Sequence, residues 1–251
     1  MTDPTTRLWD LRLENRTALI TGAGRGIGRA CAAAFAAAGA HVIAVARTEA
    51  DLRSLSREYP QAIEIWVSDV TEESFYQRIE GLPTLDVLIN NAGTNRPEPF
   101  VDVSTENLNL VIELNVRAMF QTAQSSVRVM VKDGGGSIIN MSSQMGHVGS
   151  PNRSVYCMTK HAVEGLTKAM AVELAPKGVR VNALAPTFIE TPMTRPMLDD
   201  PGFKEFIKSM MPLGRVGQPN DVAVAALYLA SDMSAMVTGH SLRIDGGWTA
   251  A

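Results

Sequence analysis

The stretch SVYCMTKHA, residues 154–162, places Tyr156 and Lys160 four residues apart. In a helix this spacing puts the two side chains on one face. A tyrosine with its ordinary pKa of about 10 is a poor proton donor or acceptor at neutral pH. A nearby ammonium group, partly shielded from water, favours the phenolate. The pair predicts a tyrosine general acid or base, although Tyr-x-x-x-Lys alone also fits an ordinary pair on a helix face.

A second stretch, TGAGRGIG (21–28), could hold a phosphate group. It follows the apolar run RTALITG and precedes a long alanine-rich segment, so it predicts a turn between a strand and a helix. Glycines allow the backbone to approach a ligand closely, and the free amides of a helix start attract anions. The spacing differs from G-x-G-x-x-G, and a purely structural turn is the alternative. The expected contacts are Gly22, Arg25, Gly26, Ile27 and Gly28.

The second apolar run ends at Arg47 and Thr48, about 20 residues beyond the glycine turn. A carboxylate near this point suits the ribose 2′-hydroxyl of NAD, whereas an arginine suits the 2′-phosphate of NADP. Arg25 offers a second positive charge. The prediction is NADP in preference to NAD, with Arg47 and Thr48 as contacts; NAD remains possible if Glu49 is the ribose ligand instead.

These residues need a scaffold, and the alternation of apolar runs with helix-length segments predicts one. Several runs are almost continuous in Val, Ile and Leu, which is typical of parallel strands buried on both faces. The prediction is a single Rossmann-type α/β domain over 1–251, a doubly wound seven-stranded parallel sheet with helices on both faces. The expected strands are 16–22, 41–46, 62–68, 85–90, 136–142, 178–185 and 240–245.

Two expected helices, 104–131 and 154–175, carry apolar residues on nearly every face. A one-sided surface helix would show a polar stripe. We therefore expect these helices to bury a second face against another subunit, in a dimer or a homotetramer, the alternative being a deep core in a monomer.

Segment 187–215 combines four prolines with several aromatic and methionine side chains. Prolines interrupt helices, and long loops in compact domains are usually functional. The segment is therefore expected to be a substrate lid with an apolar underside.

Composition excludes several classes of protein. The 251 residues are 45% hydrophobic and carry a net charge of −3, which gives no basic surface for nucleic acid or anionic membrane. The start of the sequence lacks the pattern of a secretory signal, and no run is long enough to span a bilayer. Cys31 and Cys157 are far apart and are expected to be reduced, buried thiols of a cytoplasmic protein.

Taken together, the motifs resemble those of the classical short-chain dehydrogenase/reductase family along nearly the whole chain. TGAGRGIG is similar to the cofactor turn of the family, SDV (68–70) to the element after its third strand, NNAG (90–93) to the motif ending its fourth strand, and DGG (245–247) to its carboxyl-terminal signature. Ser143 lies thirteen residues before Tyr156, which is the spacing of the catalytic serine in the family.

The resemblance implies an NAD(P)-dependent oxidoreductase with a catalytic set of Asn115, Ser143, Tyr156 and Lys160. Tyr156 would exchange a proton with the substrate oxygen, and Ser143 would position and stabilise that oxygen. Lys160 would also hold the nicotinamide ribose, and Asn115 would hold a water that relays protons to Lys160.

The resemblance also implies the remaining contacts. Asp69 and Val70 would meet the adenine, and no metal is required. The other expected cofactor contacts are Asn91, Ala92, Gly93, Tyr156, Lys160, Pro186, Ile189 and Thr191, and the expected substrate contacts are Ser143, Gln144, Tyr156, Thr187 and Met193.

Thr187 is a departure, because the family usually has glycine after this proline. Ser142 is a rival for the role of Ser143, and the spacing favours Ser143.

Several polar side chains near the expected pocket predict a small hydroxylated substrate. The prediction is interconversion of a secondary alcohol and a ketone of sugar or polyol type. An alternative enzyme is a 3-oxoacyl-(acyl-carrier-protein) reductase, which would want a basic patch at the pocket mouth, for which Arg128, Lys132 and Lys177 are candidates. A non-catalytic NADP-binding scaffold protein is the alternative from another class, since a fold does not fix a function.

Overall fold

The computed structural model describes residues 10–250 and has a seven-stranded, all-parallel sheet at its centre. The order β3-β2-β1-β4-β5-β6-β7 reverses direction between β1 and β4, which is the doubly wound topology predicted from the sequence. The strands are β1 (Thr17–Thr21), β2 (His41–Ala46), β3 (Ile63–Val67), β4 (Val87–Asn90), β5 (Gly136–Met141), β6 (Val179–Pro186) and β7 (Ser241–Ile244).

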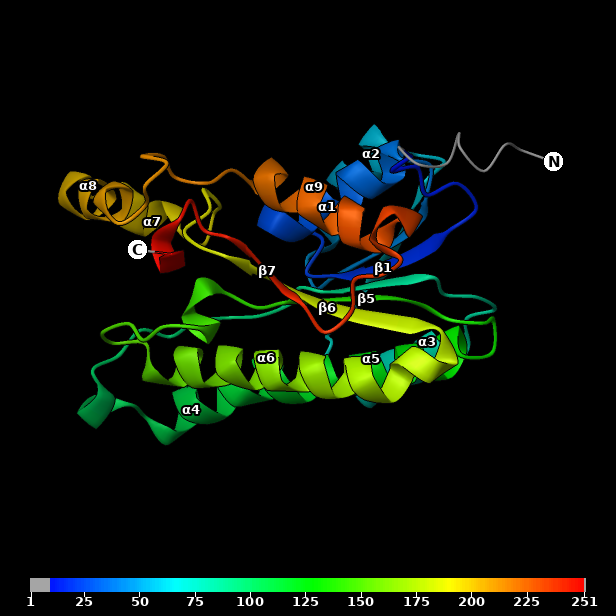
Figure 1. The fold of residues 1–251 in the computed structure, drawn as a ribbon, viewed down its shortest axis with the longest axis horizontal. Coiled ribbons are helices and arrows are strands. Elements are labelled where there is room, and N and C mark those ends of the chain that lie inside the picture. Colours follow the sequence, from blue (N-terminus) through cyan, green and yellow to red (C-terminus); the bar gives the residue numbers. More distant parts are fainter. Residues whose placement is uncertain (1–9, 251) are drawn as a thin grey trace.

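Helices cover both faces of the sheet, as Figure 1 shows. On one face lie α1 (Gly26–Ala37), α2 (Glu49–Glu58) and α9 (Pro219–Ala230), and on the other lie α3 (Glu73–Glu80), α4 (Thr105–Ile112), α5 (Ala118–Met130) and α6 (Ser154–Leu174). Each layer closes over its own apolar core, with Phe35 and Leu52 on the first side and Phe75 and Met130 on the second. Burial on both faces explains why the strand sequences are almost continuously apolar.

The predicted helix 104–131 is α4 and α5 joined by a π-helical turn over Glu113–Arg117. Asn115 lies in this turn and is fully buried. Single π turns inserted in α-helices occur frequently at functional sites. The irregularity therefore coincides with one of the predicted catalytic residues.

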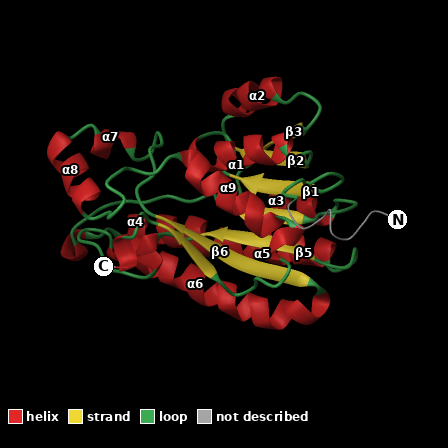
Figure 2. Cartoon of the chain, turned by 45° about the horizontal axis from the view of Figure 1, so that its top comes forward, coloured by secondary structure: helices red, strands yellow, loops and turns green. Residues whose placement is uncertain are grey.

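Segment 187–215 is more ordered than a loop. It contains two short helices, α7 (Arg195–Leu198) and α8 (Pro201–Ser209), which Figure 2 shows beyond one end of the sheet. The expectation that prolines interrupt helix here is wrong for Pro196 and Pro201, because each lies in the first turn of a helix, where no amide donor is needed. The side chain of Asp200 caps α8 by accepting from the amides of Gly202 and Phe203.

Both cysteines are free and buried, as expected. Within residues 10–250 no helix combines the length and the apolar character needed to cross a membrane.

Candidate active site

The predicted catalytic residues meet at the carboxyl edge of the sheet, where ligands bind in open α/β folds. Ser143 follows the end of β5 and is buried. Its hydroxyl accepts from the amide of Met145 at 3.2 Å and donates to the carbonyl of Pro186 at 3.4 Å. The side chain thereby links the ends of β5 and β6. Its rival Ser142 is also buried, and its hydroxyl has no hydrogen-bond partner within the described residues.

Lys160 is buried in α6 below the predicted general acid. Its ammonium group donates to the carbonyl of Met141, at the end of β5, at 2.7 Å and lies 5.5 Å from the centre of the Tyr156 ring. Burial lowers the pKa of Lys160 from 10.5 to about 8, and the negative charge of Glu164 opposes this change.

Burial raises the pKa of Tyr156, while a hydrogen bond with Ser143 and the positive charge of Arg153 lower it. The expectation that Lys160 by itself makes the phenol acidic is therefore wrong for this arrangement. The physical reason is that burial penalises the phenolate and the ammonium alike, which leaves desolvation as the largest effect on each pKa.

Asn115 connects α6 to the loop after β4. Its side-chain oxygen accepts from the amide of Thr94 at 2.8 Å, and its amide group donates to the Thr94 carbonyl and to the hydroxyl of Thr159. Thr159 in turn donates to the carbonyl of Tyr156 at 2.8 Å. Both amide protons of Asn115 are thus used in holding the Tyr156 turn of α6 in place.

The glycine turn forms a tight cradle around the start of α1. Gly22 and Gly26 have positive φ angles of 68° and 58°. A Cβ atom on Gly28 would lie 2.3 Å from the carbonyl oxygen of Gly22, so only glycine fits there. No side chain caps the first turn at Arg25. Free amides and a backbone that a ligand can approach closely suit a pyrophosphate group.

The end of β4 is fastened to this cradle. The hydroxyl of Thr21 accepts from the amides of Asn91 and Ala92, and the Asn91 side chain donates to the carbonyl of Thr21 at 2.9 Å. Asn91 therefore has a structural role in the turn. Gly93 gives space to Asn115, whose side-chain oxygen would lie 3.1 Å from a Cβ at that position.

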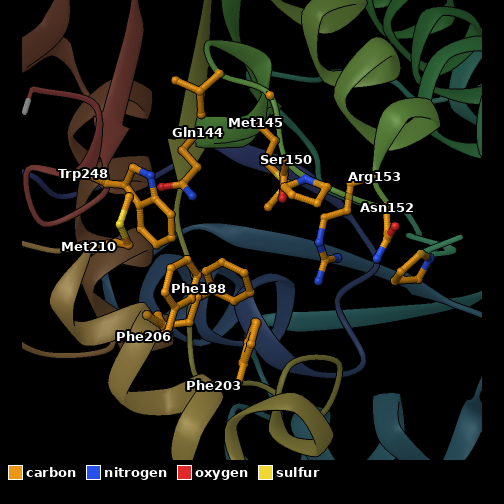
Figure 3. Close-up of a pocket in the computed structure, with 15 residues that line it drawn as sticks. Gln144, Met145, Ser150, Asn152, Arg153, Phe188, Phe203, Phe206, Met210 and Trp248 are labelled. Carbon is orange, nitrogen blue, oxygen red and sulfur yellow. The ribbon is translucent and has the colours of Figure 1, made fainter. Parts of the chain in front are cut away.

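A cavity of about 450 Å³ opens beside the catalytic residues, between α6 and the segment 187–215. Figure 3 shows Gln144 and Arg153 directed into it from different sides, above Phe188. Neither Ser143 nor Tyr156 lines it directly, but their neighbours Gln144 and Arg153 do, and Tyr156 packs on the cluster formed by Met145 and Phe188. The lining residues are Pro97, Gln144, Met145, Val148, Gly149, Ser150, Pro151, Asn152, Arg153, Phe188, Phe203, Phe206, Ile207, Met210 and Trp248.

Comparison with known proteins agrees with this arrangement. A family model described as enoyl-(acyl carrier protein) reductase matches residues 22–249. The chain is 43% identical to L-xylulose reductase of Bos taurus over 96% of its length and 99% of that protein, and 41% identical to a 3-oxoacyl-(acyl-carrier-protein) reductase of Thermotoga maritima over 94% and 99%. A crystal structure of a gluconate 5-dehydrogenase from Burkholderia cenocepacia, in complex with NADP and tartrate, superposes with a TM-score of 0.92, 36% identity and coverage of 97% and 99%.

The chain belongs to the classical short-chain dehydrogenase/reductase family. It is an NAD(P)-dependent oxidoreductase that interconverts a secondary alcohol and a ketone. The predicted family resemblance and reaction type are thus confirmed.

The predicted ribose contacts of this dehydrogenase/reductase include an exposed ion pair. Arg47 lies 3.6 Å from the carboxylate of Asp69. Burial alone would raise the pKa of Asp69, but hydrogen bonds from Thr71 and the charge of Arg47 bring it below its usual value. Thr48 begins α2 without a side-chain cap, and Val70 is buried beside Asp69. The predicted contacts are therefore close together, and Arg47 is held where β2 ends.

The predicted nicotinamide wall follows β6. Thr191 lies over the glycine turn, with its methyl group 3.3 Å from where a Gly26 Cβ would stand. Ile189 is buried in the core on the first side of the sheet. Thr187, the departure from the family pattern, donates its amide to the Ile244 carbonyl at 3.1 Å. Its hydroxyl is buried and has no partner within residues 10–250.

The structure places the predicted substrate contacts unevenly. Gln144 lines the cavity, whereas Met193 is exposed and lies outside the lining. Trp248, which stacks on Phe188 with ring centres 6.0 Å apart, was missed by the sequence reasoning. Its position directly after DGG was the available signal, but a tryptophan near the end of a chain is equally typical of a core.

The buried lysine gives a test that needs no substrate. Below about pH 8 Lys160 is charged in both the folded and the unfolded state. Between pH 8 and 10.5 the folded state loses this proton first, so the wild type should gain stability relative to Lys160→Met as the pH rises. The expected gain in the free energy of unfolding is about 3 kcal/mol, since one pKa unit corresponds to about 1.4 kcal/mol.

Denaturant unfolding of both proteins across this range measures the gain. Lys168→Met, on the exposed side of the same helix, is the control and should give the same difference from wild type at every pH. A constant difference between wild type and Lys160→Met would contradict the buried ammonium group.

Proposed function

We propose that this dehydrogenase/reductase acts on a small hydroxylated compound of sugar or polyol type, with NADP as the preferred cofactor. The observation that supports the proposal is that Ser143, Tyr156 and Lys160 lie together at the carboxyl ends of β5 and β6, next to residues that line the cavity. Relatives named L-xylulose reductase and gluconate 5-dehydrogenase favour this substrate class.

With its pyrophosphate held at the glycine cradle, the cofactor would supply or accept a hydride through its nicotinamide ring. In ketone reduction the carbonyl carbon gains this hydride, and Tyr156 gives its phenolic proton to the carbonyl oxygen. In alcohol oxidation the phenolate takes that proton back. Burial raises the pKa of Tyr156, but the alkoxide that develops on the substrate is a far stronger base than a phenolate, so the phenol can still donate its proton to it. Ser143 donates a hydrogen bond to the same oxygen and stabilises the charge that develops on it.

Lys160 has two proposed roles. Its ammonium group provides donors for the hydroxyls of the nicotinamide ribose, and its charge is kept close to the phenol by the bond to Met141. Asn115 is proposed to complete the set in two ways. Its side chain fixes this part of α6 to the loop after β4, and the π turn in which it lies would hold a water that passes protons to Lys160. The residues proposed to contact the cofactor are the cofactor contacts named in the sequence analysis.

The experiment that tests the function is a panel of ketoses, aldonic acids, polyols and simple ketones, followed at the nicotinamide absorbance with NADP(H) and NAD(H). Turnover of hydroxylated compounds in preference to simple ketones is expected. Preferred turnover of a 3-oxoacyl thioester, or no turnover at all, would overturn the proposed substrate class.

The carrier-protein alternative has less support. Arg128 and Lys132 lie just before β5, and Lys177 lies just before β6, so all three are at the amino edge of the sheet. Arg128 is also paired with Glu80. The cavity lies at the opposite, carboxyl edge, and these residues therefore do not form a basic patch at its mouth. The scaffold alternative is disfavoured because the four predicted catalytic residues are all present, and Ser143 and Lys160 are hydrogen-bonded at the ends of β5 and β6.

Arg47→Asp tests the cofactor preference. The substitution removes the proposed partner of the 2′-phosphate and places a new carboxylate beside that of Asp69. We expect the ratio of kcat/KM for NADP to that for NAD to fall by about 100-fold, as for loss of a charge-assisted contact. Steady-state kinetics with both cofactors measures the ratio, and an unchanged ratio would mean that another group binds the ribose.

The assembly is proposed to be a homo-oligomer, either a dimer or a tetramer. Apolar side chains on the outer faces of α4, α5 and α6 are exposed, namely Leu110, Phe120, Met158 and Val172. Exposed apolar patches mark interfaces.

We further propose that segment 187–215 acts as the substrate lid, since Phe203 and Phe206 of α8 line the cavity. We also propose that the protein works in the cytoplasm, where its two thiols stay reduced.

A further inference from the structure

Arg153 is a charged side chain that the proposed reaction does not use. It stands at the start of α6 and points into the cavity toward Phe188 (Figure 3). Its guanidinium carbon lies 5.9 Å from the centre of the Phe188 ring, and its one side-chain hydrogen bond goes to the sulfur of Met197 at 3.2 Å. Among residues 10–250 no carboxylate lies within ion-pair distance of it.

The lack of a carboxylate partner distinguishes Arg153 from two arginines of the segment 187–215. Arg195 and Arg215, both more exposed and outside this cavity, each pair with a carboxylate, Glu190 and Asp221 respectively. Burial lowers the pKa of Arg153, which shows that its charged form is partly removed from water. An arginine remains charged in proteins, so such a group is stabilised by an anion that enters the cavity.

The start of α6 adds to this attraction. The helix is 21 residues long, and no side chain caps its first turn. The positive end of the helix dipole therefore lies at the residue that carries the guanidinium group. Both the side chain and the helix favour a negative group here.

A second polar group faces the same space. Gln144 is 1% exposed, and its side-chain oxygen has no hydrogen-bond partner within the described residues. A buried amide oxygen without a partner is costly, and a donor from a ligand would satisfy it. A hydroxyl group is such a donor. The remaining wall is aromatic, with Phe188 in contact with Phe203 and Trp248, and presents flat faces to the carbon skeleton of a ligand.

We propose that Arg153 binds a carboxylate of the substrate and that Gln144 accepts a hydrogen bond from one of its hydroxyls. The substrate class is then a hydroxy acid or keto acid of sugar-acid type rather than a neutral ketose or polyol. This inference rests on the proposed function and adds the anionic group to it. Arg153 precedes Tyr156 by three residues at the start of the same helix, so the carboxylate lies near the reacting carbon without taking part in the reaction.

The test compares gluconate with sorbitol, which share a six-carbon polyol chain and differ in one carboxylate. Wild-type kcat/KM should be at least about tenfold higher for gluconate. Arg153→Gln should lower the gluconate value by about 100-fold and the sorbitol value by less than about threefold, as expected for loss of a charge-assisted bidentate pair. Arg153→Lys keeps the positive charge but loses the two parallel donors of the guanidinium group. Its kcat/KM for gluconate should therefore lie between that of the wild type and that of Arg153→Gln.

Arg128→Gln is the matched control, because Arg128 lies on α5 at the edge of the sheet opposite the cavity and is paired with Glu80. This control variant should have the same kcat/KM as the wild type for both gluconate and sorbitol. Equal losses on gluconate and sorbitol in Arg153→Gln, or a wild type that prefers sorbitol, would overturn the inference while leaving the proposed function intact.

A binding measurement separates the inference from the proposed function. Tartrate, a hydroxylated dicarboxylate, should raise the melting temperature of the wild type and of Arg128→Gln but not that of Arg153→Gln. If no compound of the panel is turned over and this shift is still seen, the carboxylate site stands and the proposed function fails. If the shift is absent or independent of Arg153, the carboxylate site is refuted.

Discussion

Tyr156→Phe should lower kcat by about 1000-fold while the affinity for NADPH stays within about twofold of wild type. The substitution removes the group proposed to exchange a proton with the substrate oxygen, and general acid–base catalysis contributes on the order of 10²–10⁴-fold. The ring itself remains and keeps its packing on Met145 and Phe188, so the fold should be preserved. Steady-state kinetics gives kcat, and fluorescence titration gives the affinity.

Tyr228→Phe is the control for this experiment. Tyr228 lies on α9, on the other face of the sheet, and losing its hydroxyl should leave turnover unchanged. Retention of more than a tenth of the activity by Tyr156→Phe would show that another group, or water, moves the proton. Loss of NADPH binding would show that the phenol holds the cofactor instead.

The sequence predicted which residues lie together at this site but not the direction in which the pKa values of Tyr156 and Lys160 shift. A four-residue spacing on a helix places Tyr156 and Lys160 on one face, and that part follows from helix geometry. The pKa of each group depends on burial and on groups far away in the sequence. The carbonyl of Met141, at the end of β5, receives the Lys160 donor, and no local pattern announces that contact.

The sheet could be predicted because its signal is local. Strands buried on both faces are continuously apolar, and all seven predicted runs form strands. The helices of segment 187–215 could not be predicted in this way, because proline disrupts the interior of a helix but is favoured in its first turn. Pro201 begins α8 only because Asp200 caps the same turn, and the sequence alone does not rank these two effects.

The cavity shows the same division between local and distant information. Gln144 was among the predicted substrate contacts, whereas Trp248 enters the wall from the other end of the chain. That contact exists because β7 pairs with β6 and delivers the residues after it to the site. Wall residues of this kind depend on the order of strands, which a single sequence specifies only through the family it resembles.

The glycine cradle supports the second prediction of large effect, Gly28→Ala. A Cβ at this position would lie 2.3 Å from the carbonyl oxygen of Gly22 and 2.5 Å from the amide nitrogen of the Asn91 side chain. Asn91 cannot move away easily, since its side chain donates a hydrogen bond to the carbonyl of Thr21 and its backbone amide donates one to the Thr21 hydroxyl. The turn must therefore open, and we expect a loss of about 3 kcal/mol in the free energy of unfolding.

The same opening moves the free amides away from the pyrophosphate, so the affinity of Gly28→Ala for NADPH should fall by at least about tenfold. Gly81→Ala is the matched control, because Gly81 has a negative φ of −81° and a Cβ there would meet nothing closer than 3.6 Å. It should keep wild-type affinity and change stability by less than about 0.5 kcal/mol. Chemical denaturation and fluorescence titration measure the two quantities on the same preparations. Wild-type NADPH affinity in Gly28→Ala would mean that the nucleotide does not depend on this turn, and the placement of the cofactor against Tyr156 would have to be given up with it.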